Sequence, residues 1–312
     1  MKRSFLISLL LGAALLAGCD KAEDGLLVCD PVEPGVASLA AFYKLFAAPV
    51  QVVEVNSNQT QTVKLLDGSS IVVPAGSFVL PSGTPAAGTV ELRVQVLGTT
   101  PQMVLNSLPS SSFFRPLEAG GHIRITARQG SSALRLRTGR FLTVNTLSPA
   151  NSSASDQLAW RGVGTASGGV TVAWSQDTVP VRTISTASGE RYFQRRVWTD
   201  SLGWFSVGRL WTSNPADTTL LRADVGGDAS ARVFLLPTQR SGAFLMKWNT
   251  QTRLMELYGV PPSTELNVLT LRSQNGQLLL GVQRATVRRG LVLRPTLEVV
   301  APEQAAALIR LQ

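Results

Sequence analysis

The sequence predicts an all-β protein made of tandem β-sandwich-like modules, with one short N-terminal helix and a short C-terminal helix. Apolar and polar residues alternate in short runs, which is typical of antiparallel strands with one buried face. Turn signals such as Asp67-Gly68 and Asn275-Gly276 separate these runs, and Asn-Gly favours a two-residue hairpin. Only 16% of the 312 residues are charged, below the usual quarter. This composition fits an extracytoplasmic β protein better than a cytosolic helical enzyme.

The N-terminus has the features of a secretory signal. Lys2 and Arg3 precede an apolar run from Phe5 to Leu16, which ends in Leu16-Ala17-Gly18-Cys19. The run is shorter than the ~20 residues that span a bilayer. Its end resembles the lipobox of bacterial lipoproteins. The resemblance implies that residues 1–18 are a lipoprotein signal peptide and that Cys19 carries a diacylglycerol and an acyl chain such as palmitate. The alternatives are an uncleaved anchor or an ordinary signal with an incidental cysteine.

Residues 19–35 are predicted to be the acylated cysteine and a flexible tether. Cys19 to Asp24 resembles the acidic export signal that sends some Gram-negative lipoproteins to the cell surface. Asp20, directly after the cysteine, resembles instead the inner-membrane retention signal of enteric bacteria. We expect a protein that is lipid-anchored in the outer membrane, faces the periplasm or the surface, and has the membrane as a partner through its acyl chains.

Residues 36–145 are predicted to form a β-sandwich domain with a leading helix. Val36 to Ala48 has apolar residues at helical spacing and ends before Pro49, so we expect a helix that packs on this domain. Thr89 to Val96 alternates cleanly between apolar and polar residues. His122 to Arg128 does the same, and its alternation places His122 on the water-facing side of a strand.

Three segments of this section resemble the β-sandwich domain of netrin receptors and ankyrins, and more closely a group of uncharacterised Gram-negative bacterial lipoproteins with a related module. They are Asp67-Gly68-Ser69-Ser70-Ile71-Val72-Val73-Pro74-Ala75-Gly76-Ser77-Phe78, Gly88-Thr89-Val90 and Leu117-Glu118-Ala119-Gly120-Gly121. The resemblance implies an interaction module. Some animal members cleave themselves at His-Phe-Ser or His-Phe-Thr, but here Ile123 follows His122, so self-cleavage is not implied.

A polar linker leads into a predicted Trp-rich β module at residues 156–212. This module holds five of the six tryptophans, and they are the candidate binding residues of a sugar-stacking platform: Trp160, Trp174, Trp198, Trp204 and Trp211. Tryptophan is also a normal component of β cores, so core packing is the alternative for each of them.

Residues 216–312 are predicted to form a second β-sandwich-like domain. Its strands are expected at 232–236, 243–248, 254–260, 266–272, 277–283 and 291–293, followed by a terminal helix over 303–311 that begins next to Pro302. The hairpin at Asn275-Gly276 is the strongest turn signal in the chain.

The net charge of +9 is unevenly distributed, since the chain from Arg182 onward has 16 basic and 9 acidic residues. Such an excess either decorates the solvent faces of strands or attracts an anionic partner. Arg195-Arg196 and Arg288-Arg289 are the densest pairs. Adjacent strand residues point to opposite faces, so the first pair should split across a sheet. Arg288-Arg289 precedes Gly290 and is the better candidate because it can lie in a turn.

The side-chain inventory argues against most catalytic chemistry. A single histidine without a Gly-x-Ser-x-Gly segment does not support a Ser-His-Asp triad, and the histidines and cysteines are too few for a typical zinc site. We therefore predict no catalytic residues, no metal site, no cofactor and no nucleic-acid partner. The leading hypothesis is a non-enzymatic binding or scaffold module of the cell envelope, with envelope proteins or anionic surface glycans as partners. The alternatives are a glycan-binding protein that uses its tryptophans and a hydrolase that uses two carboxylates.

Overall fold

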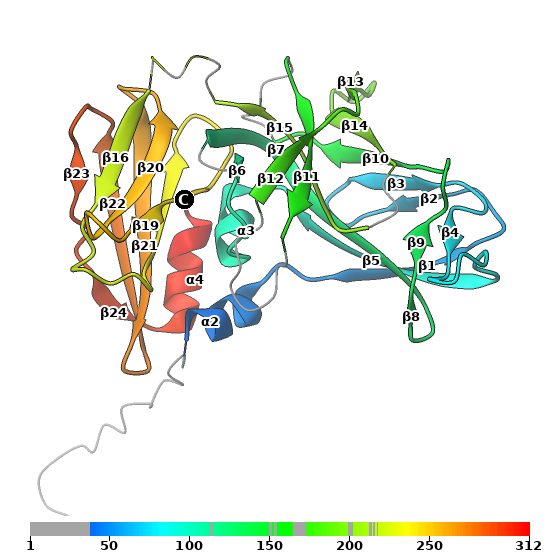
Figure 1. Cartoon of the computed structure of the whole chain (residues 1–312), viewed down its shortest axis with the longest axis horizontal. Helices are drawn as coiled ribbons and strands as arrows, with labels where there is room; N and C mark the ends of the chain where they lie inside the picture. The colour runs from blue at the N-terminus through cyan, green and yellow to red at the C-terminus, as the bar shows by residue number, and fades with distance from the viewer. Residues whose placement is uncertain are drawn as a thin grey trace, which may run out of the picture. The chain divides into compact units, whose positions relative to one another are not determined.

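The computed structural model describes residues 38–112, 115–149, 152, 155–164, 173–198, 202–211, 214, 216 and 218–312. These residues belong to one compact unit, residues 35–312. Cys19, the signal peptide and the tether lie outside the described residues. Within the described part the protein is all-β with short helices at both ends, as predicted (Figure 1). The described helices are α2 (Leu39–Phe46), α3 (Thr100–Leu105) and α4 (Pro302–Arg310).

Among the described residues, none of the helices combines the length and the apolar character needed to cross a bilayer.

Helix α2 confirms the predicted leading helix within shorter limits. It begins after Ser38, whose side-chain oxygen accepts a hydrogen bond from the backbone N–H of Ala41 at 3.1 Å, and this satisfies one of the free amides of the first turn. Its Phe42 is fully buried in a cluster with Phe234 and Leu269. The same cluster includes Leu97 and Leu117 of the first section, so the helix packs on the predicted first domain and also on the sheet of the C-terminal section.

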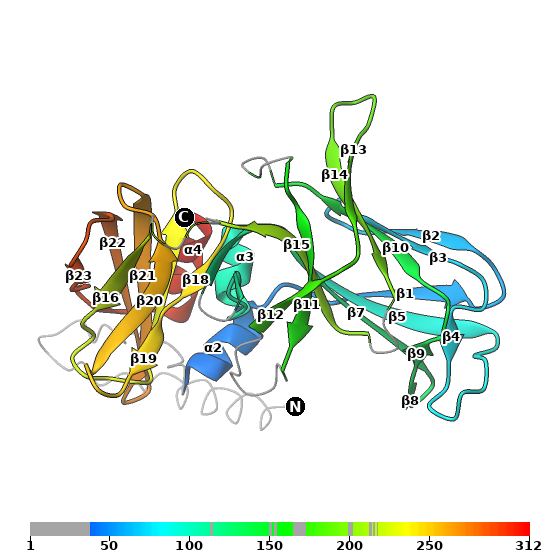
Figure 2. The same ribbon diagram turned by 45° about the horizontal axis from the view of Figure 1, so that its top comes forward.

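The first two sections of the chain share two sheets. The larger has the order β1-β5-β7-β15-β11-β12, with β6 and β8 also paired to β7, and the second has the order β13-β14-β10-β3-β2. Figure 2 shows β13 and β14 beside β10. The strands of the larger sheet are β1 (Gln51–Asn56), β5 (Thr89–Leu97), β6 (Ser111–Ser112), β7 (Arg115–Gln129), β8 (Ser132–Ala133), β11 (Leu158–Val163), β12 (Ala173–Asp177) and β15 (Trp204–Leu210). Those of the second are β2 (Gln61–Lys64), β3 (Ser70–Val73), β10 (Leu142–Leu147), β13 (Val181–Ser185) and β14 (Arg191–Val197).

Strand pairing therefore crosses the boundary predicted between residues 145 and 156. β15 pairs with β7 and β14 pairs with β10, so the Trp-rich section completes the sheets that the first section begins. A core of valines, leucines and isoleucines lies between these sheets, with Ile71, Leu92 and Ile125 fully buried. The short pair β4 (Phe78–Val79) and β9 (Arg135–Leu136) packs against the same core.

The alternation predicted for β5 and for the second half of β7 is confirmed, but His122 is not on a water-facing side. Its side chain is fully buried. The reason is that β7 is covered on both faces from Pro116 to Ile123. The indole of Trp174 stacks on the imidazole with 4.5 Å between ring centroids. The alternation of β7 alone could not predict this cover, because Trp174 comes from a different strand.

The C-terminal section forms two further sheets, with orders β19-β20-β16-β23 and β18-β17-β21-β22-β24. The predicted hairpin is confirmed: Asn275 and Gly276, both at positive φ, join β21 to β22. Helix α4 is also confirmed, and it contacts α3. The strands are β16 (Thr219–Ala223), β17 (Arg232–Pro237), β18 (Phe244–Leu245), β19 (Lys247–Asn249), β20 (Leu254–Val260), β21 (Glu265–Gln274), β22 (Gln277–Thr286), β23 (Val292–Leu293) and β24 (Glu298–Val300).

Candidate binding sites

The five candidate tryptophans do not form one platform. Trp160 and Trp174 are buried, and their indole N–H groups donate to the carbonyl oxygens of Gly208 and Pro109, both at 2.8 Å. Within the described residues no two tryptophan rings are in contact. Trp160 and Trp174 are therefore core residues with satisfied donors.

The other three tryptophans have different surroundings. Trp204 is partly buried against the core that contains Trp160. Trp198 is 47% exposed beside Phe141, and the guanidinium of Arg196 lies 4.4 Å from the Phe141 ring centroid. Trp211 lines one of the surface hollows of the described structure.

That hollow, the Trp211 pocket, has a volume of about 320 Å³. Three segments build it: the end of β15, the β17–β18 loop and the β20–β21 loop. Trp211 is fixed by its backbone N–H, which donates to the carbonyl of Pro116 at 3.0 Å, and by its ring, which packs 4.9 Å from that of Phe244. The lining residues are Trp211, Pro237, Gln239, Arg240, Pro261, Pro262, Ser263, Thr264 and Glu265.

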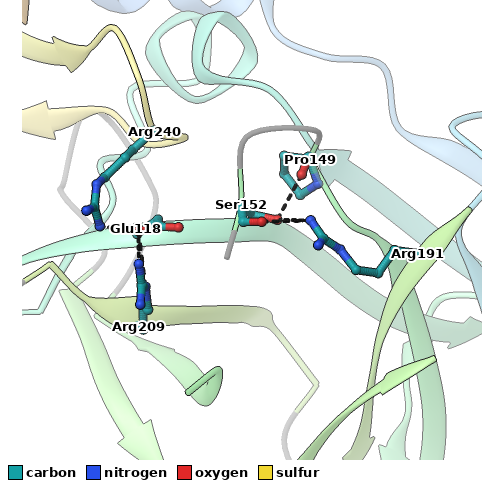
Figure 3. Close-up of polar contacts among 6 residues, drawn as sticks. All are labelled: Glu118, Pro149, Ser152, Arg191, Arg209 and Arg240. Carbon is teal, nitrogen blue, oxygen red and sulfur yellow. Dashed lines mark hydrogen bonds and ion pairs between the residues drawn. The ribbon is translucent and has the colours of Figure 1, made fainter. Parts of the chain in front are cut away.

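A buried carboxylate fixes the arginine of this pocket. Glu118 on β7 is 2% exposed, and its Oε2 accepts from Arg240 Nη1 at 2.7 Å and from Arg209 Nη2 at 3.0 Å (Figure 3). Hydrogen bonds between ionised partners are about twice as strong as neutral ones. Two guanidinium groups share this one carboxylate, so the local charge is positive. Arg240 is 39% exposed and places part of this positive charge at the wall of the pocket.

The pocket is also lined by a carboxylate. Glu265 is 43% exposed and pairs with Arg284 at 2.6 Å on the surface. The pocket thus combines apolar indole and pyrrolidine faces with one cationic, one anionic and one amide side chain, the last being Gln239. Pockets with apolar walls and a few fixed polar groups are the usual form of small-ligand sites.

A second hollow, of about 870 Å³, lies where the β2–β3 and β13–β14 turns approach each other. Asp67 and Glu190 line it, so two carboxylates share this hollow. Its arginine, Arg191, is held by neutral acceptors. Nη2 donates to the carbonyl of Ser152 at 2.7 Å (Figure 3), and Nε donates to Ser148 Oγ at 3.0 Å.

His122 belongs to a buried polar cluster. Its Nε2 lies 3.0 Å from Ser110 Oγ and its Nδ1 lies 2.8 Å from Ser206 Oγ. Burial lowers the pKa of His122 from 6.5 to about 3. The ring is therefore neutral at physiological pH, and with both nitrogens bonded to buried hydroxyls it joins three segments of the chain. A substrate has no access to it in this arrangement.

The two arginine pairs that the sequence analysis identified differ in how deeply their side chains are buried. Arg195 is buried and Arg196 is exposed, so the expected split across a sheet is confirmed. Arg195 Nη2 lies 2.9 Å from Asp177, and burial lowers the pKa of the guanidinium to about 10. Arg288 and Arg289 are exposed beside the Gly290 turn, where the N–H of Leu291 donates to the carbonyl of Arg288.

Sequence reasoning missed the polar residues of the Trp211 pocket. Gln239 and Arg240 come from the β17–β18 loop and Glu265 begins β21. All three are distant from Trp211 in the sequence, and no spacing connects them. Glu118 belongs to the Leu117-Glu118-Ala119-Gly120-Gly121 segment, but nothing in that segment indicates its ion pairs with two distant arginines. In the described part of the chain, no group of three or more His, Cys, Asp or Glu side chains is placed to hold a metal ion.

No family model, no curated protein and no solved structure that was compared with this chain matches it.

Proposed function

We propose that the protein is a non-enzymatic, lipid-anchored protein of the cell envelope whose Trp211 pocket binds a glycan. The Leu16-Ala17-Gly18-Cys19 segment supports a lipid anchor, and the resemblance of Cys19 to Asp24 to an acidic export signal supports the outer membrane. The resemblance of residues 36–145 to interaction modules supports a binding role. The main support for the proposal is the set of residues that line the Trp211 pocket.

The Trp211 pocket has the mixture of surfaces that a sugar ring needs. The C–H faces of a pyranose pack on an aromatic ring, while its hydroxyls need donors and acceptors at the edge of that ring. Here Gln239, Arg240 and Glu265 supply both kinds of group. The salt link from Glu118 fixes Arg240 before any ligand arrives, and such preorganisation lowers the entropic cost of binding.

The test is a glycan array probed with the purified mature protein, followed by calorimetric titration of the glycans that bind. We expect Trp211→Ala to weaken binding by about tenfold, since covering ~60 Å² of apolar surface contributes ~1.5 kcal/mol. Glu265→Gln should also weaken binding without unfolding the protein, because its ion pair with Arg284 is exposed.

Trp198→Ala is the matched control, since Trp198 is more exposed and lies outside the pocket. If it weakens binding as much as Trp211→Ala does, or if neither change has an effect, the assignment to the Trp211 pocket is wrong.

A further inference from the structure

A third hollow lies on the outer face of the larger sheet, and three arginines line it. Its volume is about 430 Å³, and it is separate from the Trp211 pocket. We call it the arginine hollow. Its lining residues are Val50, Arg93, Gln95, Arg124, Thr126, Ala127, Arg128 and Ala133.

Strand register brings the three arginines together. Arg93 on β5 is directly opposite Thr126 on β7. Arg124 and Arg128 are two residues to either side of Thr126, so each is a diagonal neighbour of Arg93. Diagonal neighbours in an antiparallel pair are about 7–8 Å apart, within the Debye length of ~8 Å at physiological salt. Arg124 and Arg128 are about 13 Å apart along β7, and Arg93 lies between them, so Arg93 can act on a ligand together with either one.

Few acidic side chains pair with the three arginines of the hollow. Arg93 has a partner in Glu91 at 3.5 Å, with both side chains more than 40% exposed. Arg128 donates to a neutral acceptor, the carbonyl of Ser131, at 3.2 Å. For Arg124 the described residues provide no ion pair. In the register of β5 and β7, Arg128 is opposite Glu91, whereas Arg93 and Arg124 are opposite the neutral Thr126 and Gln95. These two strands therefore set three arginines of the hollow against one carboxylate.

A buried amide also faces the hollow. Gln95 is 8% exposed, and its Nε2 donates to the carbonyl of Ala48 and to Asn106 Oδ1 at 2.7 and 2.9 Å. These two bonds fix the orientation of the amide. Because both N–H groups of this amide are used in these bonds, Gln95 shapes the wall. The groups of the hollow that can donate to a ligand are the guanidinium groups and the Thr126 hydroxyl.

We propose that the arginine hollow is a binding site for a phosphate group. Arginine presents a planar fork of donors that matches the oxygens of a phosphate, and it is the preferred residue for such recognition. The same group can come from a soluble phosphate ester or from a phospholipid headgroup. This site does not depend on glycan binding at Trp211.

The experiment uses the chain from Asp20 onward, which lacks acyl chains but keeps the whole compact unit of residues 35–312. In the soluble arm, inorganic phosphate and glucose 6-phosphate are titrated, with glucose as the uncharged match. In the membrane arm, the protein is sedimented with phosphatidylcholine vesicles that contain or lack phosphatidylglycerol.

Arg124→Gln should weaken binding in the arm that carries the ligand by about fivefold to tenfold, the effect of losing one charge-assisted hydrogen-bond donor. Arg182→Gln is the matched control: it removes the same charge from an exposed position on β13, outside the hollow. It should leave binding unchanged. Arg124→Gln should not lower the melting temperature, because it relieves repulsion.

Binding in the soluble arm alone identifies a soluble ester, and binding in the membrane arm alone identifies a headgroup. The proposal is overturned if neither arm shows binding that depends on phosphate. It is equally overturned if Arg182→Gln weakens binding as much as Arg124→Gln does, since the effect would then be net charge.

Discussion

His122 should make the stability of this protein depend on pH in a range where few other side chains titrate. It is the only histidine in the chain. Burial holds its folded-state pKa near 3, against 6.5 for the free side chain. The unfolded chain therefore takes up a proton below pH 6.5 that the folded chain excludes. Stability is complete above pH 6.5 and falls as the pH decreases towards 3.

The magnitude follows from the two pKa values. Between pH 8 and pH 5 the free energy of unfolding should fall by about 2 kcal/mol, and by about 3 kcal/mol at pH 4. Asp228 and Glu256, whose pKa values are lowered by hydrogen bonds and by arginine despite the opposing effect of burial, lose their contribution only below their ordinary values of 3.8 and 4.5.

The assay is urea unfolding at pH 8, 7, 6 and 5, for the parent and for His122→Gln. A glutamine can still bond to Ser110 and Ser206, but it cannot take up a proton and it loses the stacking on Trp174. We expect a less stable variant whose stability is nearly constant over this range. Parallel curves for parent and variant would refute the reasoning. So would a histidine Hε1 resonance in the folded parent that titrates near pH 6.

Four further predictions use other parts of the molecule. Cys19→Ala should abolish incorporation of labelled palmitate by growing cells, and equal label in variant and parent would exclude the lipobox assignment. Glu118→Gln should lower the free energy of unfolding in urea by about 2 kcal/mol, because three donor contacts to a carboxylate oxygen are weakened while their arginines stay partly hydrated. Gly208→Ala should cost about 1–3 kcal/mol in the same assay, since a Cβ there would lie 2.7 Å from the carbonyl oxygen of Glu118; an unchanged midpoint would contradict the close approach. The double change Arg288→Glu and Arg289→Glu should weaken retention on heparin only if this exposed turn contacts an anionic glycan, and identical elution would make the arginine excess compositional.

Periodicity and turn chemistry account for the parts of the fold that the sequence predicted well. The hairpin at Asn275-Gly276 and the alternation of β5 depend on neighbouring residues, so local sequence specifies them. Helix α3 was missed although its signal was present. Thr99 and Gln102 form a capping box in which each side chain bonds the backbone of the other end.

Features that depend on distant segments could not be predicted in this way. The burial of His122 is due in part to Trp174, and the Trp211 pocket requires loops from two strand pairs of the C-terminal section. The arginine hollow could not be predicted from the sequence for another reason. Arg93, Arg124 and Arg128 lie in the section with the more balanced charge, and only the register of β5 and β7 shows that they are neighbours.

The strand order also has a consequence for how the chain folds during synthesis. β7 pairs with β5 on one side, but its other neighbour, β15, ends at residue 210. Until β15 has been made, one edge of β7 is unpaired, and until β14 (Arg191–Val197) has been made, one edge of β10 is unpaired. Unpaired edges recruit strands from other chains, and pairings between distant segments form slowly. The nascent protein should therefore pass through a long aggregation-prone stage, and a chain that ends at residue 145 should associate with itself rather than remain monomeric.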